Sequence, residues 1–156
     1  MEDYFAYMAQ ALNEANKAAL HGDVPVGAVA VANGQVIAAR HNEKELRQNP
    51  TCHAEILLVD ELARARSSWH LDGVTVVLTL EPCLMCIGAL LAARVERVVF
   101  GAHDPKAGAC GTLYNPGCDP RLNHEIEIVG GVREVECSAL LADYFGHIRN
   151  SRGDKD

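Results

Sequence analysis

The spacing of apolar residues in the first part of the chain predicts one helix followed by a pair of strands. Residues 25–42 contain two β-rich runs joined at Asn33-Gly34, which is a strong signal for a two-residue hairpin turn. Residues 3–21 instead repeat apolar side chains at the three- and four-residue spacing of an amphipathic helix. Those side chains are Phe5, Met8, Ala9, Leu12, Ala15, Ala19 and Leu20.

The remaining chain alternates apolar runs of strand and helix character. Residues 41–52 are polar and end in Asn49-Pro50-Thr51, so we expect a loop that leads into a helix. A long loop rich in Gly, Pro, Asp and Asn, with room for a turn or two of helix, is expected at 102–124. The other expected elements are a helix from about His53 to Arg66, a buried strand at 73–82, a helix at 83–94, a strand at 95–102, a short strand at 125–131 and a helix at 135–149.

Strands that alternate with helices indicate a single α/β domain, a sheet covered by helices, over residues 1–150. Residues 151–156 are expected to form a frayed tail. The composition, 49% apolar and 22% charged, is ordinary for a globular protein. The first residues carry acids where a signal peptide carries bases, so we expect a cytoplasmic protein in which the six cysteines are thiols or ligands rather than disulfides.

The formal net charge of −7 argues against a general nucleic-acid binder, which usually has a basic excess. It leaves open a local basic patch, and scattered solvated charges are the simpler alternative. The residues that could form such a patch are Arg40, Lys44, Arg47, Lys106, Arg121, Arg149 and Arg152.

Cys83 and Cys86 follow a predicted strand and open a predicted helix, where free N–H groups favour thiolates. Taken alone, this pair fits a redox dithiol, half of a zinc site or two buried structural cysteines. His53 and Glu55 also lie at a helix start, two residues apart, so one can face a metal while the other leans over the open coordination position. One His and two Cys ligands leave a fourth coordination position on zinc for water. The bound water can lose a proton to become hydroxide, and Glu55 can carry that proton.

The combination of H-x-E and P-C-x-x-C is similar to the signature of the zinc deaminases of nucleobases. The chain resembles the cytidine deaminase superfamily, and within it the bacterial branch that deaminates adenosine in tRNA. Nearly the whole chain is covered, and the fourth of the matching stretches is the one specific to that branch. The stretches are DVPVGAVAV (23–31), CHAEI (52–56), TLEPCLMCIGAL (79–90) and RVVFGAHDPKAGACGTL (97–113), with LNHEIEI and LLADYF behind them.

The resemblance implies a three-layer α/β/α sandwich with a mixed sheet of about five strands, and a homodimer. It implies that His53, Cys83 and Cys86 bind one Zn²⁺ and that Glu55 shuttles protons while hydroxide attacks C6 of a wobble adenosine in a tRNA anticodon stem-loop, forming inosine. The implied substrate contacts are Asn42, Val26 and the Ala54 N–H for the base, Asp104 and Lys106 for the backbone or ribose, Asn123 and His124 for flanking nucleotides, and Phe145 and Arg149 for the splayed loop.

Three alternatives remain at this point. One is a deaminase of a free base or nucleoside of guanine or cytosine type on the same fold, and the others are a non-catalytic zinc protein and a redox dithiol protein. Residues 114–121 contain two prolines and a glycine where many relatives are more apolar, which predicts a different loop path there. Cys52 and Cys110 flank the expected pocket and are interpreted as small apolar residues.

Overall fold

The computed structural model describes residues 3–153. In chain order its elements are α1 (Tyr4–Leu20), β1 (Gly27–Ala32), β2 (Gln35–His41), α2 (Lys44–Arg47), α3 (Ala54–Arg66), β3 (Thr75–Leu80), α4 (Leu84–Ala92), β4 (Arg97–Ala102), the 3₁₀ turn η1 (Pro116–Cys118), β5 (Glu127–Val129) and α5 (Glu134–Gly153).

The five strands form one mixed sheet in the order β2-β1-β3-β4-β5. β1 is antiparallel to both β2 and β3, whereas β3, β4 and β5 run parallel. The β1–β2 hairpin turns at Asn33 and Gly34, whose φ angles of 51° and 73° are the positive values that a type I′ turn requires. The predicted hairpin is therefore confirmed.

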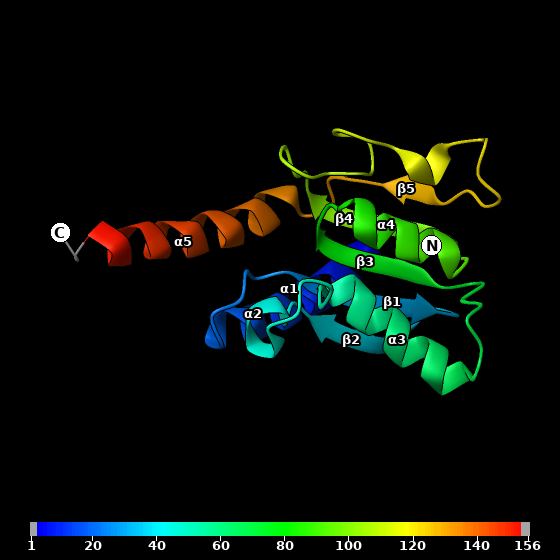
Figure 1. Ribbon diagram of the computed structural model, residues 1–156, viewed down its shortest axis with the longest axis horizontal. Helices are drawn as coiled ribbons and strands as arrows, with labels where there is room; N and C mark the ends of the chain where they lie inside the picture. The colour runs from blue at the N-terminus through cyan, green and yellow to red at the C-terminus, as the bar shows by residue number, and fades with distance from the viewer. Residues whose placement is uncertain (1–2, 154–156) are drawn as a thin grey trace.

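Helices cover both faces of the sheet (Figure 1). Successive side chains of a strand point to opposite faces, so a strand that is apolar throughout gives both faces an apolar surface for helices to pack on. Ala28 and Ala30 of β1 pack with α3 and α4, while Val29 and Val31 pack with α1 on the other face. The first part of α5 joins the α1 layer through the buried Cys137. The predicted three-layer sandwich is confirmed.

Two details differ from the expected elements. The polar segment 41–52 contains the four-residue helix α2, which ends at Gln48 with a left-handed φ of 50°. The last helix includes residues 151–153, which we expected to belong to a frayed tail, and it projects beyond the sheet (Figure 1). Residues 154–156 of the expected tail lie outside the described residues. Within residues 3–153, no helix has the length and apolarity needed to cross a membrane.

Candidate active site

The starts of α3 and α4 bring the three predicted metal ligands together. His53 and Cys83 occupy the N-cap positions of these helices, and neither side chain is used to cap its helix. Cys86 lies one turn into α4. The Nδ1 of His53 is 3.5 Å from the Sγ of Cys86 and 3.8 Å from the Sγ of Cys83, and the three atoms all lie within 4.8 Å of one another.

The electrostatics of this cluster favour a bound cation. A hydrogen bond from the Cys86 thiol, together with His53, lowers the pKa of Cys83 to about 4 against the effect of burial. The same contact with Cys83, together with burial, raises the pKa of Cys86, and the hydrogen bond to Cys83 raises that of His53. The side chains of His53, Cys83 and Cys86 thus share protons with one another. One divalent ion in the same space could bind all three of their ligand atoms. Two sulfurs and an imidazole are a donor set that zinc prefers, so the residues fit zinc.

Glu55 lies in the first turn of α3 with its side chain inside the protein. The residue is only 4% exposed, and its Oε1 has no hydrogen-bond partner among the described residues. Burial raises the pKa of this carboxyl, and a hydrogen bond with Cys86 opposes that effect only in part. An unpartnered buried carboxylate oxygen is costly, and this oxygen is available to a ligand in the space beside the three metal-capable groups.

His53, Glu55 and Cys83 line one cavity of about 210 Å³. That volume is below the roughly 300–1,000 Å³ of pockets for drug-sized ligands, and it suits a single base rather than a whole nucleotide. Besides His53, Glu55 and Cys83, its lining consists of Val24, Val26, Asn42, Lys44, Ala54, Leu80, Glu81, Asp104 and Ala107. The structure therefore brings the predicted base-binding residues Val26, Asn42 and Ala54 to the same cavity as the metal cluster.

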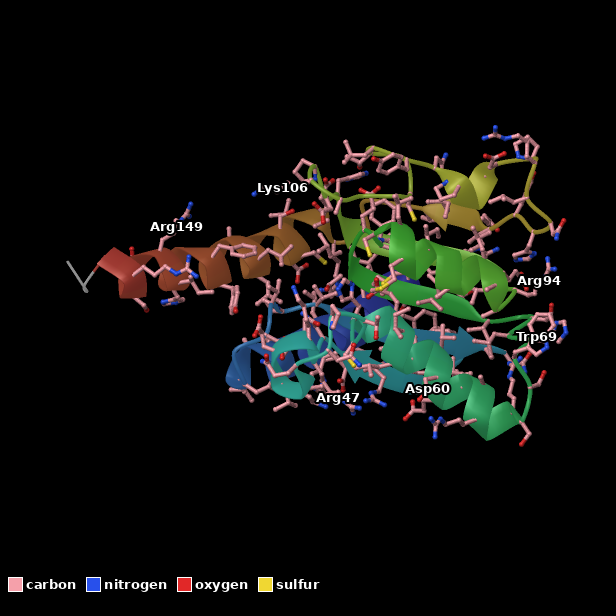
Figure 2. All side chains as sticks on the ribbon, in the orientation of Figure 1. Arg47, Asp60, Trp69, Arg94, Lys106 and Arg149 are labelled. Atoms are coloured by element: carbon pink, nitrogen blue, oxygen red, sulfur yellow. The ribbon has the colours of Figure 1, made fainter. Side chains whose placement is uncertain are left out.

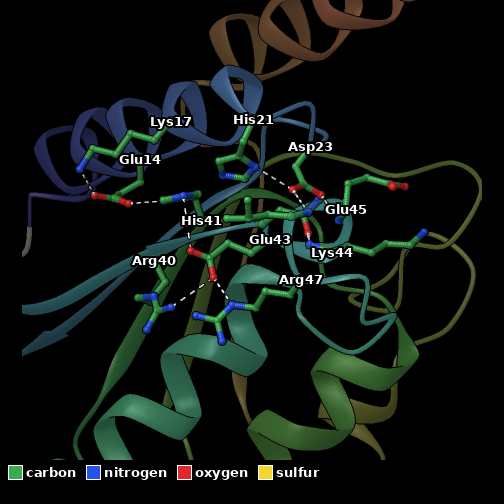
Figure 3. A network of polar contacts seen from close by, with 12 residues as sticks. Glu14, Lys17, His21, Asp23, Arg40, His41, Glu43, Lys44, Glu45 and Arg47 are labelled. Carbon is green, nitrogen blue, oxygen red and sulfur yellow. Dashed lines mark hydrogen bonds and ion pairs between the residues drawn. The ribbon is translucent and has the colours of Figure 1, made fainter.

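One wall of the cavity is held by Asp23, a residue to which sequence reasoning gave no role. Its fully buried carboxylate accepts hydrogen bonds from the backbone N–H groups of Glu45 (2.6 Å) and Leu46 (3.0 Å) at the start of α2 (Figure 3). This anchor places Asn42 and Lys44 at the cavity. The Oδ1 of Asn42 accepts from the Lys44 N–H, which fixes the orientation of the amide.

A second wall is held by Glu81, which sequence reasoning also missed although it stands two residues before Cys83. Its carboxylate, on a residue 2% exposed, accepts from the N–H groups of Asp104, Cys110 and Thr112 and from the Thr112 hydroxyl. The only signal in the sequence is an acid directly after an apolar strand, which does not reveal its partners.

The predicted RNA contacts Asp104, Lys106 and Phe145 lie next to the cavity. Asp104 lines it, but its Oδ1 already accepts from the N–H groups of Lys106 (2.9 Å) and Ala107 (3.2 Å). Lys106 and Phe145 line an adjacent groove that shares Asp104 with the cavity. These three residues therefore form a continuous surface leading out of the pocket.

The other predicted contacts lie elsewhere. Asn123 and His124 line a separate groove beside α4, and the His124 Nε2 is 2.7 Å from the Val95 carbonyl oxygen. Figure 2 shows Arg149 on the projecting part of α5 and Arg94, which borders the groove of Asn123, at the far end of the molecule. The structure therefore does not bring Asn123, His124 or Arg149 to the cavity.

The seven basic residues considered for a patch do not gather into one surface. Arg40 and Arg47 both pair with Glu43 (Figure 3), and Arg121 pairs with Asp119. Lys44 lines the cavity and Lys106 lines the adjacent groove, and both side chains are exposed.

Comparison with known proteins gives a family, a curated relative and two solved structures. A family model described as MafB19-like deaminase matches residues 2–149. The tRNA-specific adenosine deaminase of Bacillus subtilis (strain 168) is 49% identical over 146 residues, covering 94% of this chain and 91% of the relative.

Among solved structures, one from work on A-to-I editing by tRNA:A34 deaminases at the wobble position of transfer RNA superposes with a TM-score of 0.83. It is 36% identical and covers 87% of this chain and 99% of its own. A guanine deaminase from Nitrosomonas europaea superposes with a TM-score of 0.75 at 24% identity, covering 92% and 85%, and shares the fold.

Proposed function

The chain belongs to the MafB19-like deaminase family and is related over most of its length to tRNA-specific adenosine deaminases, and from this we propose that it hydrolyses adenosine to inosine at the wobble position of a tRNA anticodon. The observation that supports this most is that Glu55, with a free carboxylate oxygen, lines one base-sized cavity together with His53 and Cys83, whose ligand atoms lie close to that of Cys86. We expect the enzyme to act in the cytoplasm, because its substrate tRNA is there.

We expect His53, Cys83 and Cys86 to hold one Zn²⁺ per subunit. Three protein ligands leave the fourth position of a tetrahedral ion open, as in other catalytic zinc sites. When bound, zinc supplies a Lewis acid that makes water acidic near neutral pH. The N-termini of α3 and α4, where His53 and Cys83 lie, add a positive potential that favours the thiolate form of Cys83.

Glu55 moves the protons in this proposal. A water molecule gives its oxygen to C6 and both of its protons to the base. The first proton passes to N1, and the second, lost when the C6–O bond becomes a carbonyl, passes to the departing amino group, which leaves as ammonia. Because burial raises the pKa of Glu55, this carboxylate can accept each of the two protons in turn and deliver the first to N1 and the second to the amino group. Its free Oε1 is available for this transfer.

The walls of the cavity hold the base. Ala54 is the first residue of α3, so its N–H has no carbonyl partner within the helix and can donate to the purine. The amide of Asn42 keeps one N–H and one lone pair beyond its bonds to Val24 and Lys44. Val26 supplies an apolar side for the ring.

The rest of the RNA would lie over the rim. A base flipped from a single-stranded anticodon loop costs little unstacking, so a modest basic rim suffices despite the net negative charge. We expect Lys44 and Lys106 to meet phosphates and Asp104 to lie near the ribose, because they line the cavity and the adjacent groove. We expect Phe145, which is 46% exposed, to stack on a neighbouring base. Asn123, His124 and Arg149 remain predicted contacts for nucleotides farther from the flipped base.

We further propose a homodimer through the exposed side of α4. Leu84 and Met85 are 49% and 36% exposed in its first turn, and Leu122, which lines a groove with Leu91 and Ala92 of α4, is 46% exposed. Exposed apolar side chains grouped along one helix are typical of a protein interface. Analytical ultracentrifugation should give twice the subunit mass, and Leu84→Glu should give monomer.

The decisive experiment is to incubate the zinc-loaded protein with an anticodon hairpin RNA that carries adenosine at the wobble position. We expect inosine at that position and no conversion of adenosines in the stem. Brisk deamination of free guanine or cytidine with an untouched hairpin would instead identify a free-base deaminase. Full activity of Glu55→Ala would overturn the proton-transfer role, because a structural zinc protein has no use for that acid.

A further inference from the structure

We propose that Glu81 is a positioning residue that ties the substrate-facing wall of the cavity, residues 104–112, to the strand leading to the zinc ligand Cys83. The inference deepens the proposed function and rests on it for its activity test. Glu81 lines the cavity together with His53 and Cys83, and its carboxylate oxygens accept hydrogen bonds from the wall itself.

The contacts of Glu81 are spread along the whole wall. Oε1 accepts from the Asp104 N–H at 3.0 Å and from the Thr112 hydroxyl, and Oε2 accepts from the N–H groups of Cys110 at 2.9 Å and Thr112 at 3.2 Å. One side chain therefore gathers three backbone donors that lie up to eight residues apart. No sequence-local structure, such as a helix or hairpin, could align those three N–H groups.

The other hydrogen bonds of the wall are mostly internal. The Gly108 N–H donates to the Asp104 carbonyl, and the Leu113 N–H donates to the Gly108 carbonyl. The Ala109 N–H donates to the Pro82 carbonyl, which is one further tie to the chain between β3 and α4. Internal bonds give the loop its shape, whereas Glu81 sets where that shape sits relative to His53 and Cys83.

The fit between Glu81 and the wall is tight. A Cβ added at Gly108 would lie 2.5 Å from the Glu81 carboxylate, so only glycine lets the backbone pass this close. Four donors converge on the two oxygens of this carboxylate, and hydrogen bonds to a carboxylate are stronger than those between neutral groups.

The test compares Glu81→Gln with wild type in the zinc-loaded protein. Glutamine keeps the shape but turns an NH₂ group toward N–H donors, so at least one donor loses its acceptor. We expect the KM for the anticodon hairpin RNA to rise by about 10-fold while kcat changes by no more than about 3-fold, since one charged hydrogen bond is of that order. Zinc content should stay at the wild-type value.

A second readout does not depend on activity. Amide hydrogen exchange of peptides covering 103–113 should become faster in Glu81→Gln, and exchange in α3 should be unchanged. If wild type does not act on the hairpin, the proposed function fails while this exchange measurement still decides the role of Glu81. Unchanged exchange together with unchanged KM would overturn the inference.

Thr112 offers a matched pair in case Glu81→Gln does not fold. Thr112→Val removes the hydroxyl donor and keeps the branched shape, whereas Thr112→Ser keeps the donor. We expect KM to rise by about 3-fold in Thr112→Val and to stay at the wild-type value in Thr112→Ser. Equal behaviour of the two variants would show that the hydrogen bond to Glu81 does not position the wall.

Discussion

Two buried glutamates line the same cavity, and they differ in their partners. Glu55 at the start of α3 is 4% exposed, has an oxygen without a partner, and its pKa is raised by burial. Glu81 at the end of β3 is 2% exposed, its carboxylate accepts four hydrogen bonds, and its pKa is lowered.

The comparison teaches that burial alone does not decide what a carboxylate does. Desolvation penalises the charged form of both groups, and the number of donors around each oxygen decides the outcome. A poorly solvated acid with a free oxygen can exchange protons with a ligand. An acid surrounded by four donors stays charged and organises the backbone instead. Within one pocket, we therefore expect Glu55 to transfer protons and Glu81 to position the backbone.

The largest effect is expected from removing one of the predicted zinc ligands next to Glu55. Cys86→Ala deletes both a predicted zinc ligand and the thiol that hydrogen bonds Glu55. We expect zinc content to fall well below one ion per subunit and inosine formation to fall below detection, because a two-ligand site binds zinc weakly. Metal analysis of the purified variant and the hairpin assay check this, and a variant with full zinc content would contradict the ligand set.

The next effect isolates Glu55. Glu55→Gln should lower kcat by about 1,000-fold, within the range of general acid–base catalysis. Zinc content and thermal stability should not fall, because the change replaces an incompletely bonded acid with a neutral amide. Single-turnover inosine formation measures the loss. Glu61→Gln, on the exposed side of the same helix, serves as the control and should keep wild-type activity.

The same substitution at the other glutamate should give the reverse pattern. Glu81→Gln is expected to lower the free energy of unfolding by about 2 kcal/mol, because buried N–H donors lose a charged acceptor. Urea unfolding followed by fluorescence measures this difference in the zinc-loaded protein. A stability loss in Glu55→Gln as large as that in Glu81→Gln would abolish the distinction between the two acids.

The smallest effect is a pH dependence of that stability difference. The folded pKa of Glu81 lies below its unfolded value, so the unfolded state binds more protons as the pH falls through that window. The contribution of Glu81 is therefore complete above the unfolded pKa and is lost as the pH falls toward the folded pKa. Wild type should keep its full advantage over Glu81→Gln from neutral pH down to about pH 5 and lose it as the pH falls below the unfolded value of 4.5. An advantage that grows on acidification would show that the sign is wrong.

Much of the fold was predictable from local pattern. Asn33-Gly34 placed the hairpin, and the apolar runs placed the buried strands, because turn chemistry and side-chain periodicity act over a few residues. Helix α2 was missed because Lys44–Arg47 has no buried residue and owes its first turn to the distant Asp23.

The metal cluster was predictable as a motif, and the structure brings its members together. The RNA contacts were not predictable to the same degree, since Asn123, His124 and Arg149 lie away from the cavity. Surface residues carry little periodic signal, and their mutual positions depend on loop paths.

The amino-acid sequence settles the order of elements, the turn at Asn33-Gly34, and the choice of His, Cys and Glu at two helix starts, since each depends on neighbours close along the chain. The tertiary structure alone decides that Glu55 keeps a free oxygen while Glu81 is fully bonded. The donors to Glu81 lie 23 to 31 residues away, and those to Asp23 lie 22 and 23 residues away. Only the folded path of the chain brings those N–H groups within hydrogen-bonding distance of a carboxylate.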